Sequence, residues 1–285
     1  MAKSRTKNRI HAIWHTIQGN SQLKVGLILL AVLLFVAIFG PMLAPYNPNR
    51  LYSETFSAPG GKFFLGTDNL GHDIWSQILY GASTSLEIGV IAAVISAVIG
   101  IAVGGIAGFY GGLADRILNE IMNMFLMLPT FFLILLIIAT FGSSMMNVMI
   151  VIGLTSWVGN ARLMRAQAIS IKERTYIKSS IAIGEDRFSI LVRHVLPNGI
   201  FPIIANTTMN ISGAILTEAG LSFLGLGDPN VISWGQIIAN GKSYLPRCWW
   251  ICTFPGIATI FTVLTFFLLG EGLNRVLSPK MDANK

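Results

Sequence analysis

The sequence predicts an all-α integral membrane protein with six transmembrane helices and both termini in the cytoplasm. Hydrophobic residues make up 53% of the 285 residues and charged residues only 12%, about half the charged share of a soluble domain. A membrane-spanning helix needs roughly 20 consecutive apolar residues. Stretches of that length without Asp, Glu, Lys or Arg occur at 25–49, 88–114, 121–161, 195–217 and 248–270.

The third of these stretches is too long for a single span. Phe141–Asn147 contains a glycine and two serines in its middle, and such residues favour a turn. We therefore expect this stretch to form two helices, with six spans in all. Their expected positions are about 23–44, 82–110, 115–141, 145–167, 198–224 and 250–275.

The orientation follows from the basic residues, because cytoplasmic segments retain Lys and Arg. With the N-terminus inside, all but four of the 20 Lys and Arg residues fall on the inner side; the exceptions are Arg50, Lys62, Lys242 and Arg247. The net charge of +7 is accounted for by this topology and by anionic membrane lipid, so it does not indicate nucleic-acid binding.

Three regions follow from this layout: a cytoplasmic basic tail at 1–22, a transmembrane domain at 23–280 and a short cytoplasmic tail at 281–285. Within the first tail, the spacing of four apolar residues favours a helix lying in the membrane interface; they are Ile10, Ile13, Trp14 and Ile17. A disordered basic tail remains the alternative before Asn8. The first span is interpreted as an uncleaved anchor, because Gly40–Pro45 is a poor signal-peptide cleavage site.

The expected external segments are residues 45–80 and 225–247. The first is rich in turn-forming Gly, Pro and Asn, which favours an ordered, folded-back loop. His72 with Asp68 and Asp73 could indicate a metal site, but hydrogen bonding within the loop is the preferred interpretation. Cys248 and Cys252 stand four residues apart, and two buried thiols at the start of a helix are favoured over a disulfide.

Small residues and one proline shape the second and third spans. Gly100, Gly104 and Gly108 recur at four-residue intervals, a spacing that lets two helix backbones approach closely in lipid. Simple packing is favoured over a sliding interface. Pro129 predicts a kink in the third span.

The most informative segment is the polar, basic loop 168–197 between two apolar stretches. Within it, Ile177, Ile181, Gly184 and Phe188 recur at helical spacing, which predicts one apolar stripe of an amphipathic helix. Such a helix could fill a groove on a partner protein or lie on the lipid surface, and the pattern alone leaves both open. Pro197 stands where a new helix would begin.

These residues also resemble a known family. Lys178-Ser-Ser, Gly184 and His194-Val-Leu-Pro-Asn198 resemble the Glu-Ala-Ala…Gly…Leu-Pro loop of ABC importer permeases. Further segments narrow the resemblance to the second ("C"-type) permease of the dipeptide, oligopeptide and nickel branch, over about residues 23–280. They are Phe64–Asp73, Gly108–Gly112 with Asp115, Ala161–Arg165, Leu221–Gly227, Ser233–Gly235 and Phe254–Gly256.

The resemblance implies the type I ABC importer permease fold, with residues 172–194 docking on an ATP-binding subunit. The residues that it assigns to ATPase coupling are Ile177, Lys178, Ser179, Ser180, Ile181, Gly184, Phe188, Leu196 and Pro197. Lys-Ser-Ser replaces Glu-Ala-Ala here, so a groove of opposite charge is expected opposite position 178.

The resemblance also implies the partners: a homologous permease in a heterodimer, two ATP-binding subunits and an extracytoplasmic substrate-binding protein docking on 45–80 and 225–247. The chain itself has no phosphate-binding loop, because Gly235…Gly241-Lys-Ser243 has the wrong spacing. ATP and Mg²⁺ would therefore be bound by the ATPase subunits, and no cofactor or metal is expected on this chain. The implied location is a bacterial or archaeal cytoplasmic membrane.

The fifth expected span carries the best candidate lining of a translocation path. Glu218 lies in its outer half, above Asn206, Thr207 and Asn210. Polar side chains that hold helices together are the favoured alternative. No catalytic constellation is present: all four His residues lie outside the apolar stretches and the chain lacks His-Glu-x-x-His.

The sequence thus predicts a non-catalytic permease subunit of an ATP-driven importer of di- or oligopeptides. Import of nickel or a metal chelate is the first alternative. A stand-alone ion-coupled carrier is less favoured, because a single isolated Glu is a thin basis for proton coupling. A membrane structural or sensory protein remains the third alternative.

Overall fold

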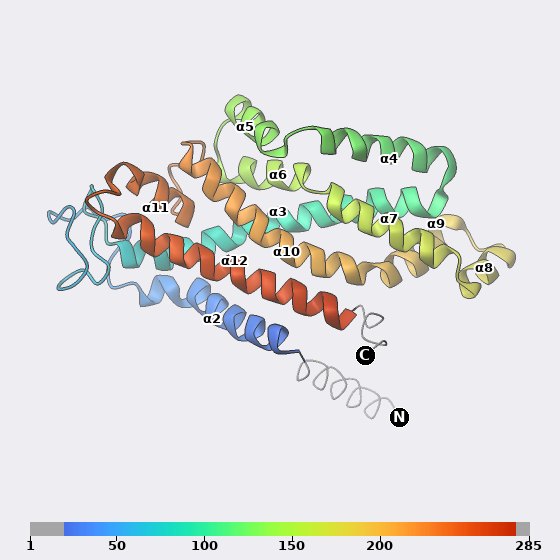
Figure 1. The fold of residues 1–285 in the computed structure, drawn as a ribbon, viewed down its shortest axis with the longest axis horizontal. Helices are drawn as coiled ribbons and strands as arrows, with labels where there is room; N and C mark the ends of the chain where they lie inside the picture. Colours follow the sequence, from blue (N-terminus) through green and yellow to red (C-terminus); the bar gives the residue numbers. More distant parts are fainter. Residues whose placement is uncertain (1–19, 278–285) are drawn as a thin grey trace.

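A computed structural model describes residues 20–277 as a bundle of helices (Figure 1). The described residues contain no β-strand, only two isolated bridges. The predicted interfacial helix and both tails beyond these residues lie outside the described range. The helices are α2 (Ser21–Leu43), α3 (Ile74–Tyr110), α4 (Gly112–Met127), α5 (Thr130–Phe141), α6 (Met145–Thr155), α7 (Val158–Lys172), α8 (Thr175–Ala182), α9 (Arg187–Ile190), a π-helical turn (Leu191–Val195), α10 (Leu196–Phe223), α11 (Trp234–Gly241), a 3₁₀ turn (Lys242–Tyr244) and α12 (Trp250–Leu277).

Four helical segments of the described chain are long and apolar enough to cross a membrane: Ser21–Leu43, Ile74–Tyr110, Arg187–Phe223 and Trp250–Val276. α4 and α5 qualify together as a fifth, bent by 84° at the break that contains Pro129. The kink predicted from this proline is confirmed. The predicted fourth span, 145–167, is divided between α6 and α7, which meet at Ser156 and Trp157. The count of six spans stays a prediction.

The second span begins earlier than predicted. α3 starts at Ile74 rather than near residue 82, because Asp73 caps it: Asp73 Oδ2 accepts hydrogen bonds from Ser76 N at 2.8 Å and Ser76 Oγ at 2.6 Å. A side-chain cap satisfies an amide at a helix start that has no partner inside the helix. The loop before α3 therefore ends at residue 73 rather than at the expected residue 80.

The two ends of the bundle carry different features. The loop before α3 lies with α11 at one end, and α8 and α9 lie at the other (Figure 1). The first residue of α2 and the last residues of α12 point toward the α8 end, where Asn20 Nδ2 donates a hydrogen bond to Gly272 O at 3.2 Å. The ends of α2 and α12 thus share a side of the bundle with loop 168–197, and the location of the termini themselves stays a prediction.

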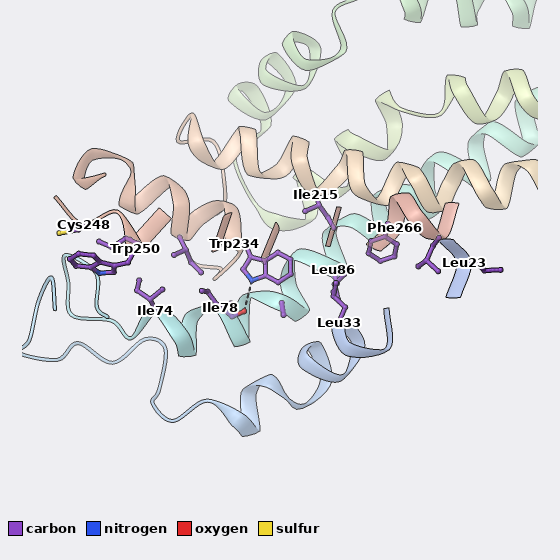
Figure 2. Packing of buried hydrophobic residues seen from close by; sticks show 14 residues of the cluster. Leu23, Leu33, Ile74, Ile78, Leu86, Ile215, Trp234, Cys248, Trp250 and Phe266 are labelled. Atoms are coloured by element: carbon purple, nitrogen blue, oxygen red, sulfur yellow. Dashed lines mark hydrogen bonds between the residues drawn. The ribbon is translucent and has the colours of Figure 1, made fainter. Parts of the chain in front are cut away.

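One core cluster joins α2, α3, α11 and α12 (Figure 2). Leu33, Leu86 and Phe266 supply apolar side chains from three of the spans, and Trp234 brings α11 into contact with them. Trp234 Nε1 donates to Ile78 O at 3.0 Å, so the indole is buried without leaving its polar hydrogen unsatisfied. The cluster fixes α11 against the spans.

The glycine stripe of α3 packs against α7. An added Cβ at Gly100 would lie 2.5 Å from Asn160 Cβ, and one at Gly108 would lie 2.5 Å from Arg165 O. At Gly104 it would overlap the carbonyl oxygen of Ala161. The preferred interpretation of this stripe, close helix packing, is confirmed.

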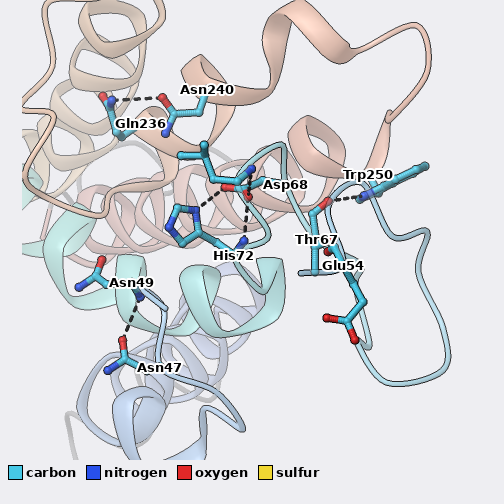
Figure 3. A network of polar contacts seen from close by, with 10 residues as sticks. Asn47, Asn49, Glu54, Thr67, Asp68, His72, Gln236, Asn240 and Trp250 are labelled. Carbon is cyan, nitrogen blue, oxygen red and sulfur yellow. Dashed lines mark hydrogen bonds and ion pairs between the residues drawn. The ribbon is translucent and has the colours of Figure 1, made fainter. Parts of the chain in front are cut away.

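The loop before α3, which is expected to be external, is ordered and folded back, as predicted (Figure 3). Asp68 Oδ1 accepts hydrogen bonds from the amides of Leu70 and His72, and His72 Nδ1 lies 2.7 Å from Asp68 Oδ2. Trp250 Nε1 donates to Thr67 O at 3.2 Å and ties the loop to the start of α12. Cys248 and Cys252 are both free thiols, as expected, but only Cys248 is buried, and it precedes α12, which begins at Trp250.

Candidate functional site

In the segment between α7 and α10, the short helix α8 is anchored by its single buried residue. Ile177 on α8 is fully buried and packs in a cluster with Met164 and Ile171 of α7 and with Ile190 of α9. Burying this isoleucine fixes the short helix to the end of the bundle, because an eight-residue helix has little stability of its own. A force on α8 therefore reaches α7 through direct side-chain contact.

The predicted single stripe is corrected by the course of the backbone. α8 ends at Ala182, and Gly184 has φ +86°, in the left-handed region. Gly184 N donates to Ile181 O and Glu185 N donates to Ser180 O, the pair of bonds that defines a Schellman motif. Phe188 belongs to the separate helix α9, so Ile177 and Phe188 do not share one helical face.

This turn instead creates an exposed apolar surface. Ile181 is 42% exposed, Ile183 83% and Phe188 65%. These three residues flank Gly184 in the chain, at the tip of the segment. Large apolar side chains exposed together mark a surface that binds another molecule. Lys178 lies beside them and pairs with Glu173 at 2.8 Å, with both side chains more than half exposed, an interaction that adds little stability.

The second half of the segment is a polar turn. Asp186 caps α9 by accepting from Ser189 N at 3.0 Å. Glu185 Oε1 accepts from Ser189 Oγ at 2.9 Å and lies 3.4 Å from His194 Nε2. The Ser189 hydroxyl holds the pKa of Glu185 below its usual range, so Glu185 stays ionised at neutral pH.

The fifth span does not begin afresh at Pro197. Helical backbone is continuous from Arg187 to Phe223, and the widened π turn lies immediately before Leu196, whose amide donates to Leu191 O. Pro197 has no backbone N–H, so it cannot donate a hydrogen bond to a carbonyl of the preceding turn. The wider π turn accommodates this missing hydrogen bond. α10 itself begins at Leu196 with Pro197 in its first turn, as expected, but it continues the helical backbone of α9 without a break.

A partly buried ion pair between α4 and α7 was missed from the sequence. Arg165 Nε and Nη2 donate to the two carboxylate oxygens of Asp115 at 2.6 and 2.7 Å. A bidentate ion pair of this kind is strong and directional. It connects the start of α4 to α7. Both residues belong to motifs noted above, but nothing local in the sequence pairs positions fifty residues apart.

The polar residues of α10 fall into three separate environments. Asn206 Nδ2 donates to Asn160 Oδ1 at 2.9 Å, and Thr207 Oγ1 lies 3.5 Å from the same oxygen. Asn160 in turn donates to Ser96 Oγ at 3.2 Å. These contacts join α10, α7 and α3, as the packing alternative predicts.

Glu218 is only 4% exposed. Its Oε1 accepts hydrogen bonds from Ser222 Oγ and Ser233 Oγ, both at 2.7 Å, which ties α10 to the start of α11. Asn210 lies elsewhere, on a hollow of about 200 Å³ between α5, α6 and α10. The structure therefore does not bring Glu218 together with Asn206 or Asn210.

The segment from Gly235 to Ser243, whose spacing does not fit a phosphate-binding loop, is helical. Gly235 and Gly241 both lie within α11, on buried positions. A helix that contains both glycines offers no loop to surround a phosphate.

Comparison with known proteins decides the family. Residues 100–283 match the family described as "Binding-protein-dependent transport system inner membrane component". Residues 11–59 match the N-terminal transmembrane domain of oligopeptide transport permease C. The dipeptide transport system permease protein DppC of Escherichia coli is 39% identical over 280 residues, which cover 95% of this chain and 93% of that protein. This chain belongs to that family of permeases.

A further relative of this permease is the di/tripeptide transport system permease protein DppC of Pseudomonas aeruginosa, 35% identical over 94% of this chain and 91% of that protein. A solved structure of the MetNI methionine ABC transporter matches with a TM-score of 0.52 and 18% identity, over 71% of this chain and 95% of that one. The match confirms the predicted permease fold. Family membership confirms the resemblance and the membrane location, and the relatives are named for transport rather than catalysis.

Proposed function

We propose that this permease forms, with a homologous permease, the translocation path of an ATP-driven importer of di- or oligopeptides. The observation that carries the proposal is the construction of segment 172–194. Ile177 is buried in the permease itself, whereas Ile181, Ile183 and Phe188 are exposed around the Schellman turn. The segment is thus fixed at one side and free to bind at the other. The names of the two relatives support peptides as the substrate.

The proposed mechanism passes through this segment. The exposed apolar surface docks in a groove of an ATP-binding subunit, and an acidic groove would complement Lys178. ATP and Mg²⁺ bind to the two ATPase subunits, which approach each other when ATP is bound. Ile177 conveys their movement to α7, and the continuous helix from Arg187 conveys it to α10. The spans then alternate between inward-open and outward-open states, a bistable transition.

The opposite end of the bundle would receive the substrate-binding protein. Residues 45–73 and 225–247 lie together there, held by the Trp250–Thr67 hydrogen bond and by the core around Trp234. Peptide released from the binding protein would enter between the two permeases. In this proposal the chain has six spans, and loop 168–197 and both termini lie in the cytoplasm.

The direct test is reconstitution of the complete complex in proteoliposomes. We expect a dipeptide with its binding protein to stimulate ATP hydrolysis and to accumulate inside the vesicles. The permease alone should do neither, with or without an ion gradient. Gradient-driven uptake by the single chain would contradict the proposal. Stimulation by a nickel chelate but by no peptide would overturn the substrate assignment while leaving the coupling intact.

A further inference from the structure

A hollow of about 200 Å³ lies where α5, α6 and α10 meet. It is placed at two helix breaks, because α5 begins directly after Pro129 and α6 ends at Thr155. On α10, Asn210, Gly213 and Thr217 stand at steps of three and four and so share one face. The polar residues that line it are Thr130, Thr155, Ser156, Asn210 and Thr217.

These polar side chains do not hold helices together. Thr155 Oγ1 donates to Val151 O at 2.8 Å, Ser156 Oγ to Ile152 O at 2.5 Å and Thr217 Oγ1 to Gly213 O at 2.8 Å. Each of these bonds stays within one helix or its cap. By contrast, Asn160 and Asn206 bond across helices. The packing alternative therefore explains the Asn160 network but leaves the lining of the hollow without a structural role.

The hydrogen bonds also define what the hollow can bind. Each of these three hydroxyls donates its hydrogen to its own helix, so its oxygen keeps lone pairs that can accept from a ligand. Asn210 and the Thr130 hydroxyl have no hydrogen-bond partner within residues 20–277 and can both donate and accept. No charged residue lines the hollow. It is neutral and rich in acceptors, and it lacks the carboxylates that a hard metal cation requires.

We propose that this hollow binds the main chain of a peptide in transit, by accepting hydrogen bonds from its N–H groups and terminal ammonium. The inference rests on the proposed function. It adds an explanation of how one permease accepts peptides with different side chains. Every dipeptide offers the same main-chain donors, and a neutral lining neither attracts nor repels a charged side chain strongly. The site therefore recognises peptides as a class without selecting among their side chains.

The test uses Thr217→Val, which removes one acceptor and preserves the shape of the side chain. Thr208→Val is the matched control, because Thr208 stands on a different face of α10 and its hydroxyl donates to Ile204 O at 2.9 Å. Uptake of a dipeptide at sub-saturating concentration is measured with the complete complex in proteoliposomes. We expect Thr217→Val to reduce uptake by about three- to tenfold, the effect of one hydrogen bond, and Thr208→Val to leave it unchanged.

Two comparisons separate main-chain recognition from a general loss of activity. The reduction should be the same for Ala-Ala, Lys-Ala and Glu-Ala. A dipeptide methylated at its peptide nitrogen should be taken up less well than its parent by the wild-type complex, and Thr217→Val should shrink that difference. The preference of the binding protein cancels, because the same binding protein is present in both complexes.

Equal uptake by the Thr217→Val and Thr208→Val complexes would overturn the inference, as would a reduction confined to charged peptides. An unchanged preference for the unmethylated dipeptide in Thr217→Val would also overturn it. Failure of the wild-type complex to take up any peptide would instead contradict the proposed function. The two failures are therefore distinguishable.

Discussion

A permease with Gly184→Val is expected to insert and assemble normally. Its ratio of peptide taken up to ATP hydrolysed should fall about tenfold. Gly184 has φ +86°, and nothing lies within 4 Å of the position that a Cβ would take. The substitution therefore causes no collision with other side chains. A β-branched residue strongly disfavours this backbone conformation, so the turn after α8 must open and Ile181 must shift relative to Phe188. The measurements are uptake and ATP hydrolysis in the same proteoliposomes.

Two controls separate backbone strain from bulk. Gly184→Asn is expected to retain most coupling, because asparagine tolerates positive φ better than other residues. Gly142→Val introduces the same strain between α5 and α6, where Gly142 has φ +91° and free space around it, and should leave the ratio of uptake to hydrolysis unchanged. A normal ratio in Gly184→Val would count against segment 172–194 as the coupling element.

Gly104→Leu is expected to destabilise the folded permease. A Cβ at Gly104 would overlap Ala161 O and lie 2.9 Å from Met164 Cβ, so α3 and α7 would have to separate along their whole contact. Overpacking of this kind lowers the free energy of unfolding by about 1–3 kcal/mol, and occasionally by more. We expect the thermal unfolding midpoint in detergent to fall by about 5 °C or more, together with the amount of permease in the membrane.

Gly256→Leu is the matched control for that experiment. Gly256 is also inside a membrane-spanning helix, α12, but nothing lies within 4 Å of an added Cβ. Its substitution should leave the unfolding midpoint close to that of the wild type. If both variants unfold at the same temperature as the wild type, close α3–α7 packing does not stabilise the bundle.

Local patterns in the sequence predicted much of the fold. Pro129 marked the break between α4 and α5, and the turn at Phe141–Asn147 separates α5 from α6. Glu271 and Arg275 stand four residues apart on α12 and pair at 3.2 Å. Each of these features depends on residues near one another in the chain. Short-range rules suffice for them.

Features that depend on tertiary contacts were not predictable in the same way. The break between α6 and α7 at Ser156 and Trp157 contains no proline or glycine signal. The Asp115–Arg165 pair and the Ser233 bond to Glu218 join residues that only the folded bundle brings together. α3 begins at Ile74 because Asp73 caps it through Ser76. Both residues are buried although they are polar, a burial that hydropathy does not register.

The coupling segment shows where periodicity misleads. The apolar residues from Ile177 to Phe188 follow a helical spacing through Gly184, yet the helix ends before that glycine. Spacing records which residues are apolar but not whether φ changes sign between them. The buried anchor and the exposed surface could be told apart only from the packing of Ile177 against α7.

The most direct test of the central claim is the accessibility of Ser179, an exposed residue on α8. Ser179→Cys and Ser53→Cys are each placed in a chain whose Cys248 and Cys252 are replaced by alanine, and intact oriented membranes are treated with an impermeant thiol reagent. We expect Ser179→Cys to react only from the cytoplasmic side and Ser53→Cys, in the external loop, only from outside. Reaction of Ser179→Cys from the outside would place the segment beyond reach of any cytoplasmic ATPase and would contradict its role in coupling.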